Sequence, residues 1–114
     1  MKKFPSIKKN SEYRSIYSKG NSKACGSLVM YIDDNGTDGN RLGISAGKKI
    51  GNSVVRHTFS RRIREIFRLN NYRTVQGKDI IVVARRSAGE AGYDKLEKDY
   101  LKLLKDHNIL VTAS

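Results

Sequence analysis

Four basic residues recur at helical spacing in the middle of the chain, and together they could bind phosphate groups. They are His57, Arg61, Arg64 and Arg68. At 100° per residue, these side chains fall within about 60° of one another on a helix. Like charges at this spacing repel unless an anion neutralises them, and a solvated charged face commonly mixes both signs. The spacing therefore favours a helix face that binds nucleic-acid phosphates over a merely solvated one.

Three tyrosines predict a second kind of contact, the stacking of nucleotide bases. Tyr13 and Tyr17 are one helical turn apart, and Tyr31 belongs to an expected strand. Bases stack on aromatic rings irrespective of sequence, so tyrosines beside basic residues suit single-stranded RNA. The alternative is that these rings fill the core. Both interpretations hold if each ring packs at an edge and leaves one face open.

Motifs for catalysis by the protein itself are incomplete. His57 could act as a general acid or base in RNA cleavage, but no second histidine is near it in the sequence. The stretch 43–49 is one residue shorter than a nucleotide-binding P-loop, and lysine replaces the hydroxyl that would hold magnesium. Lys48 and Lys49 are instead expected to bind a backbone phosphate beside a helix N-terminus. The single cysteine, Cys25, is expected to be a small buried side chain.

The elements that position these residues alternate between helix and strand. Helices are predicted from an Asn10 cap to Gly20, from Asn52 or Ser53 to about Leu69, and from about Tyr93 to Asp106. The long middle helix carries an apolar stripe opposite its basic face, formed by Val55, Phe59, Ile63 and Ile66. Strands are predicted over 27–32, 41–46 and 79–84. We expect the first two to form an antiparallel hairpin, and the third, apolar throughout, to be central.

The composition indicates one basic domain with a polyanionic partner. The chain has 114 residues, 23 Lys and Arg against 11 Asp and Glu, and a net charge of +12. Residues 1–23 carry +6 and residues 41–73 carry +8, whereas residues 24–40 carry −3 and the remainder +1. We expect the two basic segments to bind the polyanion and the last segment to build the fold. Apolar runs long enough for a membrane span or signal peptide are absent from the sequence, so a cytoplasmic location is expected.

The stretch 41–68, RLGISAGKKIGNSVVRHTFSRRIREIFR, resembles the signature of the bacterial ribonuclease P protein component family. These proteins are the small basic subunit of the ribonucleoprotein that removes 5′ leaders from precursor tRNA. IKKNSEYRSIYSKG, LVMY and DIIVVARRSA resemble the family's first helix, central strand, and the strand and turn after the arginine-rich helix. The matches follow the family's order over most of residues 7–105.

The resemblance has departures at the start of the arginine-rich helix. The family commonly has Arg-Asn-Arg there, with a further Lys before the next Arg. Here Arg56 is kept, but His57, Thr58 and Ser60 occupy the other places. Arg62 and Arg68 are expected to compensate in charge, although at different angles on the helix.

The resemblance implies an α/β (α+β) two-layer sandwich of αβββαβα order, a single RNA-binding domain over residues 1–114. Its sheet has about four strands, including a short one near residues 22–25, with a left-handed β-α-β crossover around the arginine-rich helix. It also implies that the RNA subunit performs the hydrolysis with Mg²⁺ that the RNA holds. The protein then has no catalytic residue and binds no metal of its own. Its partners are the catalytic RNA subunit and precursor tRNA, with no DNA or membrane partner.

The resemblance assigns two groups of site residues. Those implied to bind the RNA subunit are Lys48, Lys49, Arg56, His57, Arg61, Arg64 and Arg68. Those implied to line a groove for the leader are Tyr13, Tyr17, Tyr31 and Ser45. A gripped leader favours precursor over mature tRNA, which phosphate contacts alone could not distinguish. Two other hypotheses stay open: a ribosomal-type structural RNA-binding protein with no role in cleavage, and a protein-only nuclease that uses His57.

Overall fold

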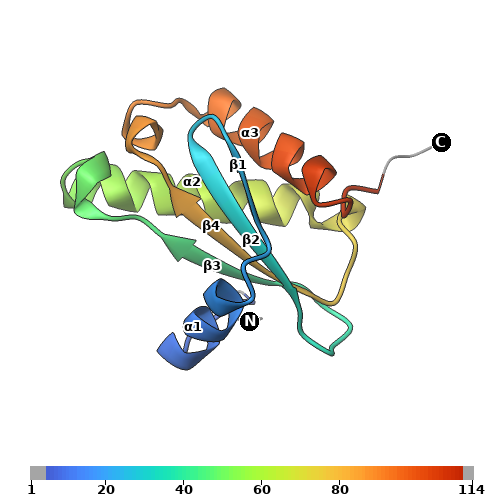
Figure 1. Cartoon of the computed structure of the whole chain (residues 1–114). Helices are drawn as coiled ribbons and strands as arrows, with labels where there is room; N and C mark the ends of the chain where they lie inside the picture. The colour runs from blue at the N-terminus through green and yellow to red at the C-terminus, as the bar shows by residue number, and fades with distance from the viewer. Residues whose placement is uncertain (1–4, 112–114) are drawn as a thin grey trace.

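The computed structural model describes residues 5–111, which form three α-helices around a four-stranded sheet (Figure 1). The helices and strands are α1 (Asn10–Ser18), β1 (Ser22–Cys25), β2 (Leu28–Asp34), β3 (Arg41–Ser45), α2 (Ser53–Asn70), β4 (Lys78–Ala84) and α3 (Tyr93–Asp106). Short 3₁₀ helices are η1 (Lys48–Ile50), η2 (Asn71–Arg73) and η3 (Arg86–Gly89). One face of the sheet carries α1, and the other carries α2 and α3.

The sheet has the strand order β1-β2-β4-β3, with β4 antiparallel to β2 and parallel to β3. Apolar side chains cover both faces of β4, as expected for its continuous apolar run. In Figure 1, β3 and β4 both point to the left, β4 lies above β3, and α2 passes behind them. The β3–α2–β4 connection is therefore left-handed, although crossovers of this kind are right-handed in nearly all proteins.

The predicted hairpin between residues 27–32 and 41–46 is wrong. The two strands are β2 and β3, and β4 lies between them. Two strands separated by a third are only about 10 Å apart, a distance that the six residues between β2 and β3 span easily. A turn-rich loop of this length is thus compatible with either arrangement. The hairpin in the structure joins β1 to β2 through Gly26, whose φ of +55° favours glycine.

The helix α2 agrees closely with its sequence pattern. The Asn52 side chain accepts a hydrogen bond from the backbone N–H of Val55 at 3.1 Å, so Asn52 is the N-cap. The predicted stripe residues Phe59, Ile63 and Ile66 are buried against the sheet and α3, while Val55 is half-buried. The first helix differs by one residue, because Lys9 is its N-cap in place of Asn10.

The core has two parts, one on each face of the sheet. The larger lies between the sheet, α2 and α3, and includes the fully buried Tyr100. The smaller lies under α1 and contains Ile7, Ile16 and Ile81. Cys25 is half-buried rather than buried, with its Sγ 3.9 Å from a carboxylate oxygen of Asp99, which corrects the expectation of a small core side chain.

Candidate nucleic-acid interface

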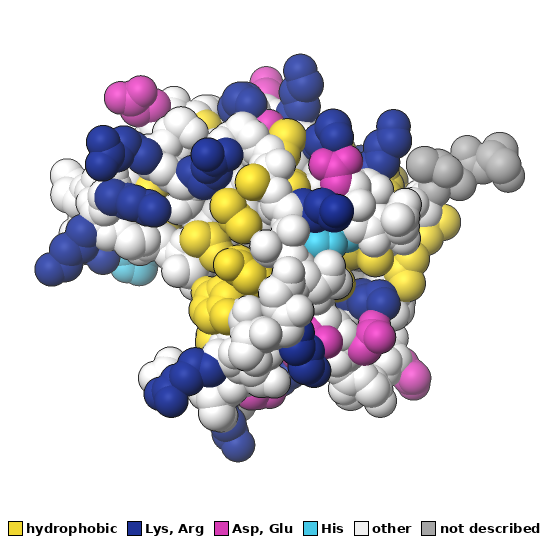
Figure 2. All heavy atoms as spheres, viewed as in Figure 1, with side chains coloured by type: hydrophobic (Ala, Val, Ile, Leu, Met, Phe, Trp, Pro, Cys, Tyr) yellow, Lys and Arg dark blue, Asp and Glu magenta, His cyan; other side chains and the backbone are white. Residues whose placement is uncertain are grey.

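A groove runs between α1 and the edge of the sheet formed by β3. It is a hollow of about 540 Å³ lined by Asn10, Tyr13, Arg14, Tyr17, Ile44 and Ser45. The ring of Tyr31 is not part of the lining but meets the Tyr17 ring edge-on, with their centroids 4.8 Å apart. Figure 2 shows side chains of the hydrophobic class, which includes Tyr, exposed across this face of the molecule between groups of Lys and Arg. The structure thus brings the four predicted leader residues together.

The tyrosines take part in packing and in the groove at once. Tyr13, Tyr17 and Tyr31 are each half-buried, and they pack on Ile7, Ile16 and Ile81. Burial raises the pKa of Tyr17, and a hydrogen bond with Ser45 partly opposes that rise. Both interpretations of the rings are therefore compatible with their positions, because each ring contacts the small core and keeps part of its surface open.

Gly43 provides the space that Tyr13 occupies. A Cβ atom at position 43 would lie only 2.8 Å from the Tyr13 hydroxyl oxygen and 2.9 Å from the ring. A side chain on β3 would therefore displace the ring and lift α1 from the sheet. Sequence reasoning placed Gly43 in a strand but did not recognise this role. The glycine within an otherwise alternating strand was the available signal.

Arg41 ties α1 to the sheet through two carboxylates. Its guanidinium donates from Nε and Nη2 to Asp79 of β4, at 2.8 and 2.6 Å, and its Nη1 lies 2.8 Å from Glu12 of α1. The hydrogen bond from Arg41 lowers the pKa of Glu12, and the bonds to Asp79 and Glu12 raise the pKa of Arg41. Because α1 carries Tyr13 and Tyr17, this ion pair fixes one wall of the groove. The three residues are far apart in sequence, and the sequence analysis missed the connection.

The exposed side of α2 is the basic ridge, defined as His57, Arg61, Arg64 and Arg68. All four side chains are exposed, as the periodicity predicted. Arg68 is partly neutralised by Glu65, which accepts hydrogen bonds from its Nε at 3.1 Å and its Nη2 at 2.6 Å. A hollow of about 320 Å³ between the first turns of the helix is lined by His57, Arg61 and Arg64 together with Ser53, Val54 and Thr58. The side chains of Arg61 and Arg64 have no ion-pair or hydrogen-bond partner among residues 5–111 and can bind a ligand.

The groove and the basic ridge meet at Arg56. A further hollow of about 320 Å³ is lined by Ile44, Ala46, Ser53, Arg56, His57 and Ser60. It shares Ile44 with the groove and His57 with the ridge. The Arg56 Nε is buried, and no acceptor within residues 5–111 bonds to it. Thr58 and Ser60, which stand where the family has basic residues, are half-buried here.

Arg62 lies at a different angle on α2 from the basic ridge, as expected. Its Nη1 donates to the backbone carbonyl of Ala91 at 3.3 Å, and its side chain is half-buried against the η3 side of α2. It lies one residue beyond Arg61, and therefore about 100° around the helix from it. The positive charge of Arg62 is directed away from the ridge.

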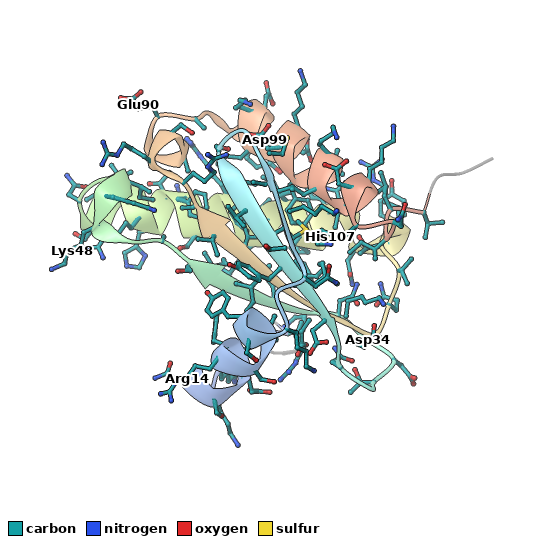
Figure 3. The ribbon with its side chains drawn as sticks, viewed as in Figure 1. Arg14, Asp34, Lys48, Glu90, Asp99 and His107 are labelled. Atoms are coloured by element: carbon teal, nitrogen blue, oxygen red, sulfur yellow. The ribbon has the colours of Figure 1, made fainter. Side chains whose placement is uncertain are left out.

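A second basic area surrounds the ends of β3 and β4. These strands are parallel, so the segments that follow them, η1 and η3, lie at the same end of the sheet (Figure 1). Lys48 and Lys49 of η1 are exposed, and Lys48 points outward at the left of Figure 3. Arg85 and Arg86 are also exposed and line a hollow of about 470 Å³. Arg85 and Arg86 of the last segment are thus exposed at the same end of the sheet as Lys48 and Lys49.

The titratable residues that line the two hollows with His57 are arginines. His107 lies at the C-terminal end of α3, where its Nε2 is 2.9 Å from the Met30 carbonyl oxygen, and burial lowers its pKa (Figure 3). The two hollows that contain His57 are lined by no carboxylate and no second histidine. Within residues 5–111, no three His, Cys, Asp or Glu residues cluster closely enough to hold a metal ion. The described helices also include none that is long and apolar enough to cross a membrane.

Comparisons with known proteins agree with this arrangement. The family model described as Ribonuclease P matches residues 1–108. The Ribonuclease P protein component of Natranaerobius thermophilus is 38% identical over 110 residues, which is 96% of each chain. That of Alkaliphilus oremlandii is 41% identical over 113 residues, or 99% of each chain. The RNase P protein structure from Staphylococcus aureus has a TM-score of 0.86 at 38% identity and covers 95% of this chain and 99% of its own. The one from Thermotoga maritima has a TM-score of 0.81 at 30% identity and covers 89% and 96%.

Proposed function

The chain belongs to the ribonuclease P protein family, and we propose that it serves a tRNA-processing ribonucleoprotein by binding RNA on two adjoining surfaces. One surface binds the RNA subunit and the other binds the 5′ leader of precursor tRNA. The observation that carries this proposal is the junction at Arg56 and His57, where the tyrosine groove continues into the basic ridge. A single strand that lies in the groove can therefore reach the RNA on the ridge without leaving the protein surface.

The basic ridge is the proposed contact for the RNA subunit. Arg61 and Arg64, which have no acidic partner in the described part of the chain, offer their guanidinium groups to phosphates, and Arg68 joins them once it parts from Glu65. His57 and Arg56 extend the surface toward the sheet, and Lys48 and Lys49 extend it toward the end where β3 stops. Such contacts depend on the backbone charge and not on base sequence.

The groove is the proposed contact for the leader. Tyr13 and Tyr17 supply open ring surface, Tyr31 supports the Tyr17 ring from the strand, and Ser45 supplies a hydroxyl at the floor. Stacking on rings accepts any base, which suits a protein that processes many precursors. Mature tRNA lacks the leader, so the groove adds affinity for the precursor alone.

Hydrolysis is assigned to the RNA subunit, together with the Mg²⁺ that supports it. Magnesium prefers oxygen ligands, in particular carboxylates and phosphates. The hollows along α2 offer guanidinium, imidazole and hydroxyl groups, and these surroundings repel a cation. His57 also has no partner there that would act as the opposite acid or base. The residues present therefore fit a phosphate ligand and not a protein-bound metal.

Reconstitution tests the proposal against its alternatives. The purified chain is mixed with a bacterial ribonuclease P RNA at low Mg²⁺ and given a labelled precursor tRNA. We expect the chain to stimulate leader removal and to cut nothing without the RNA. Binding to RNA without stimulation would instead indicate a structural RNA-binding protein. Cleavage by the chain alone, lost in His57→Ala, would indicate a protein nuclease.

A further inference from the structure

A separate aromatic site lies at the C-terminal end of α2, outside the groove and beyond the last arginine of the ridge. Tyr72 of η2 has a relative exposure of 82%, the highest of any large hydrophobic residue in the described part of the chain. Leu69, Val75 and Val111 are exposed as well. The backbone N–H of Val111 donates to the Arg73 carbonyl at 2.7 Å, so the C-terminal segment lies beside η2. Exposed apolar side chains gathered in one place mark a contact surface.

Tyr72 lies just beyond the end of the helix that carries the basic ridge. The 3₁₀ helix η2 follows α2 directly, and Asn71 keeps helical angles with φ −65° and ψ −29°. Arg68 lies in the last turn of α2, and Tyr72 follows four residues later, past Asn70, whose φ of −110° and ψ of 1° end the α-helix. A ligand that follows the arginines along α2 therefore meets the Tyr72 ring next.

The neighbouring guanidinium is held in place by a buried amide. The Arg73 guanidinium carbon lies 5.8 Å from the centroid of the Tyr72 ring, within cation–π range. Asn70, which is 2% exposed, accepts hydrogen bonds from Arg73 Nε at 3.0 Å and Nη2 at 2.6 Å. The Asn70 amide nitrogen in turn donates to the Ile66 carbonyl at 2.8 Å. The Arg73 cation is thus fixed beside an open ring before any ligand arrives.

We propose that Tyr72 and Arg73 form a stacking site for one unpaired nucleobase of the RNA subunit. The base stacks on the open face of the Tyr72 ring, and Arg73 or Arg68 contacts the adjoining phosphate. RNA is favoured over a protein partner because the chain carries a net charge of +12 and two arginines, Arg68 and Arg73, lie at this end. The two acids at the same end are engaged within the protein: Glu65 pairs with Arg68, and Glu97 accepts a hydrogen bond from the Asn70 amide at 3.3 Å. The RNA subunit is favoured over the leader, because the groove meets α2 near Arg56 in its first turn, whereas Tyr72 lies beyond the opposite end of this helix (Figure 1). This proposal rests on the proposed function.

The test compares three variants in binding to a bacterial ribonuclease P RNA at fixed salt and Mg²⁺. Tyr72→Ala is expected to raise the Kd by roughly 5- to 150-fold, the loss typical of one stacked base. Tyr72→Phe keeps the ring and should bind like the parent chain. Val111→Ala removes an exposed apolar side chain from the same end and should also bind like the parent. The slope of log Kd against log salt should stay unchanged in all three, because stacking releases no counterion.

A tryptophan reporter reads the stacking directly. The chain has no Trp, so Tyr72→Trp introduces a single fluorophore. We expect its emission to be quenched on addition of the RNA and to remain unchanged on addition of mature tRNA alone.

The outcomes separate this proposal from the one on which it rests. If the parent chain binds the RNA and Tyr72→Ala binds equally well, the stacking site is overturned while the proposed function stands. If the parent chain itself fails to bind, both are overturned. Equal losses in Tyr72→Ala and Val111→Ala, or a dimer in sedimentation that Tyr72→Ala dissociates, would identify a protein contact and overturn the stacking site.

Discussion

At the scale of single residues, the groove depends on side chains that serve the core and the ligand together. Tyr17 packs on the small core under α1, contacts Tyr31 and lines the groove. Its spacing to Tyr13 was readable from the sequence, but the choice between core and groove was not. Gly43 explains why both apply, since the missing side chain lets the Tyr13 ring lie flat against the strand.

Tyr17→Ala is expected to weaken binding of precursor tRNA to the reconstituted complex by about 1–3 kcal/mol, the range for one stacked base. Binding of mature tRNA should not change, because it has no leader. Equilibrium binding of both ligands measures the difference, with Tyr17→Phe as the control that keeps the ring. Equal losses for the two ligands would assign Tyr17 to the core alone.

At the scale of elements, the position of α1 decides the shape of the groove. We expect Glu12→Gln to weaken its link to Arg41 and to reduce the preference for precursor over mature tRNA by a few-fold. Assembly with the RNA subunit should be unaffected, because the basic ridge is on α2. Asp94→Asn removes the same charge from an exposed site on α3 and serves as the control. A loss of assembly affinity in Glu12→Gln would contradict this role.

The ridge on α2 carries a prediction about salt. Arg61→Ala combined with Arg64→Ala should weaken assembly and reduce the salt slope by about 0.7–0.9 of a log unit for each lost phosphate contact. Arg68→Ala should have the smaller effect, because Glu65 already neutralises it in the free chain.

The matched control for the ridge is the pair Lys98→Ala and Lys105→Ala, which removes the same charge from exposed positions on α3. Titrations at several salt concentrations give the slopes. A slope that falls equally in both double variants would mean that overall charge, and not the ridge, sets the affinity.

Helices were more predictable than the order of strands. The limits and the inward face of α2 follow from the Asn52 cap and the 3.6-residue period, which are local properties. The pairing of β3 with β4, in contrast, depends on residues far apart along the chain. A hairpin is the default for two strands with a short turn-rich loop, and only tertiary packing decides whether a third strand inserts between them.

At the scale of the whole molecule, strand order also decides where charge collects. The segment charges indicated that residues 1–23 and 41–73 meet the polyanion. They could not indicate that Arg85 and Arg86 lie at the same end as Lys48 and Lys49, because this follows from β3 and β4 being parallel neighbours. The handedness of the crossover was likewise available only from the family resemblance.

The stability of the whole fold should depend on Asp99 at low pH. Asp99 accepts hydrogen bonds from the Ser27 N–H at 2.9 Å, the Ser27 hydroxyl at 2.7 Å and Lys95 Nζ at 2.9 Å, which joins α3 to the turn between β1 and β2. Burial opposes ionisation, but these hydrogen bonds outweigh it and hold the pKa of Asp99 below its usual 3.8. Because this pKa is lowered, the contribution of ionised Asp99 to the free energy of unfolding is complete above about pH 4. It is lost as the pH falls through the pKa of Asp99 in the folded state.

Asp99→Asn should therefore lower the free energy of unfolding at pH 7 by about 1–3 kcal/mol, the range for an unsatisfied buried partner. The difference from the parent chain should narrow below about pH 4. Urea unfolding at pH 7 and pH 3 measures it, with the exposed Asp38→Asn as the control. If Asp99→Asn lowered the free energy of unfolding by the same amount at pH 7 and pH 3, the ionised form of Asp99 would not be the source of the stabilisation.

The central place of β4 has a consequence for how the chain matures on the ribosome. Both β2 and β3 pair with β4, yet β4 is the last strand to be synthesised. Until residues 78–84 leave the exit tunnel, the nascent chain can close its first hairpin and wind α2, but it has no strand on which β3 can align. The protein thus reaches its native sheet only after β4 has been synthesised and has left the tunnel.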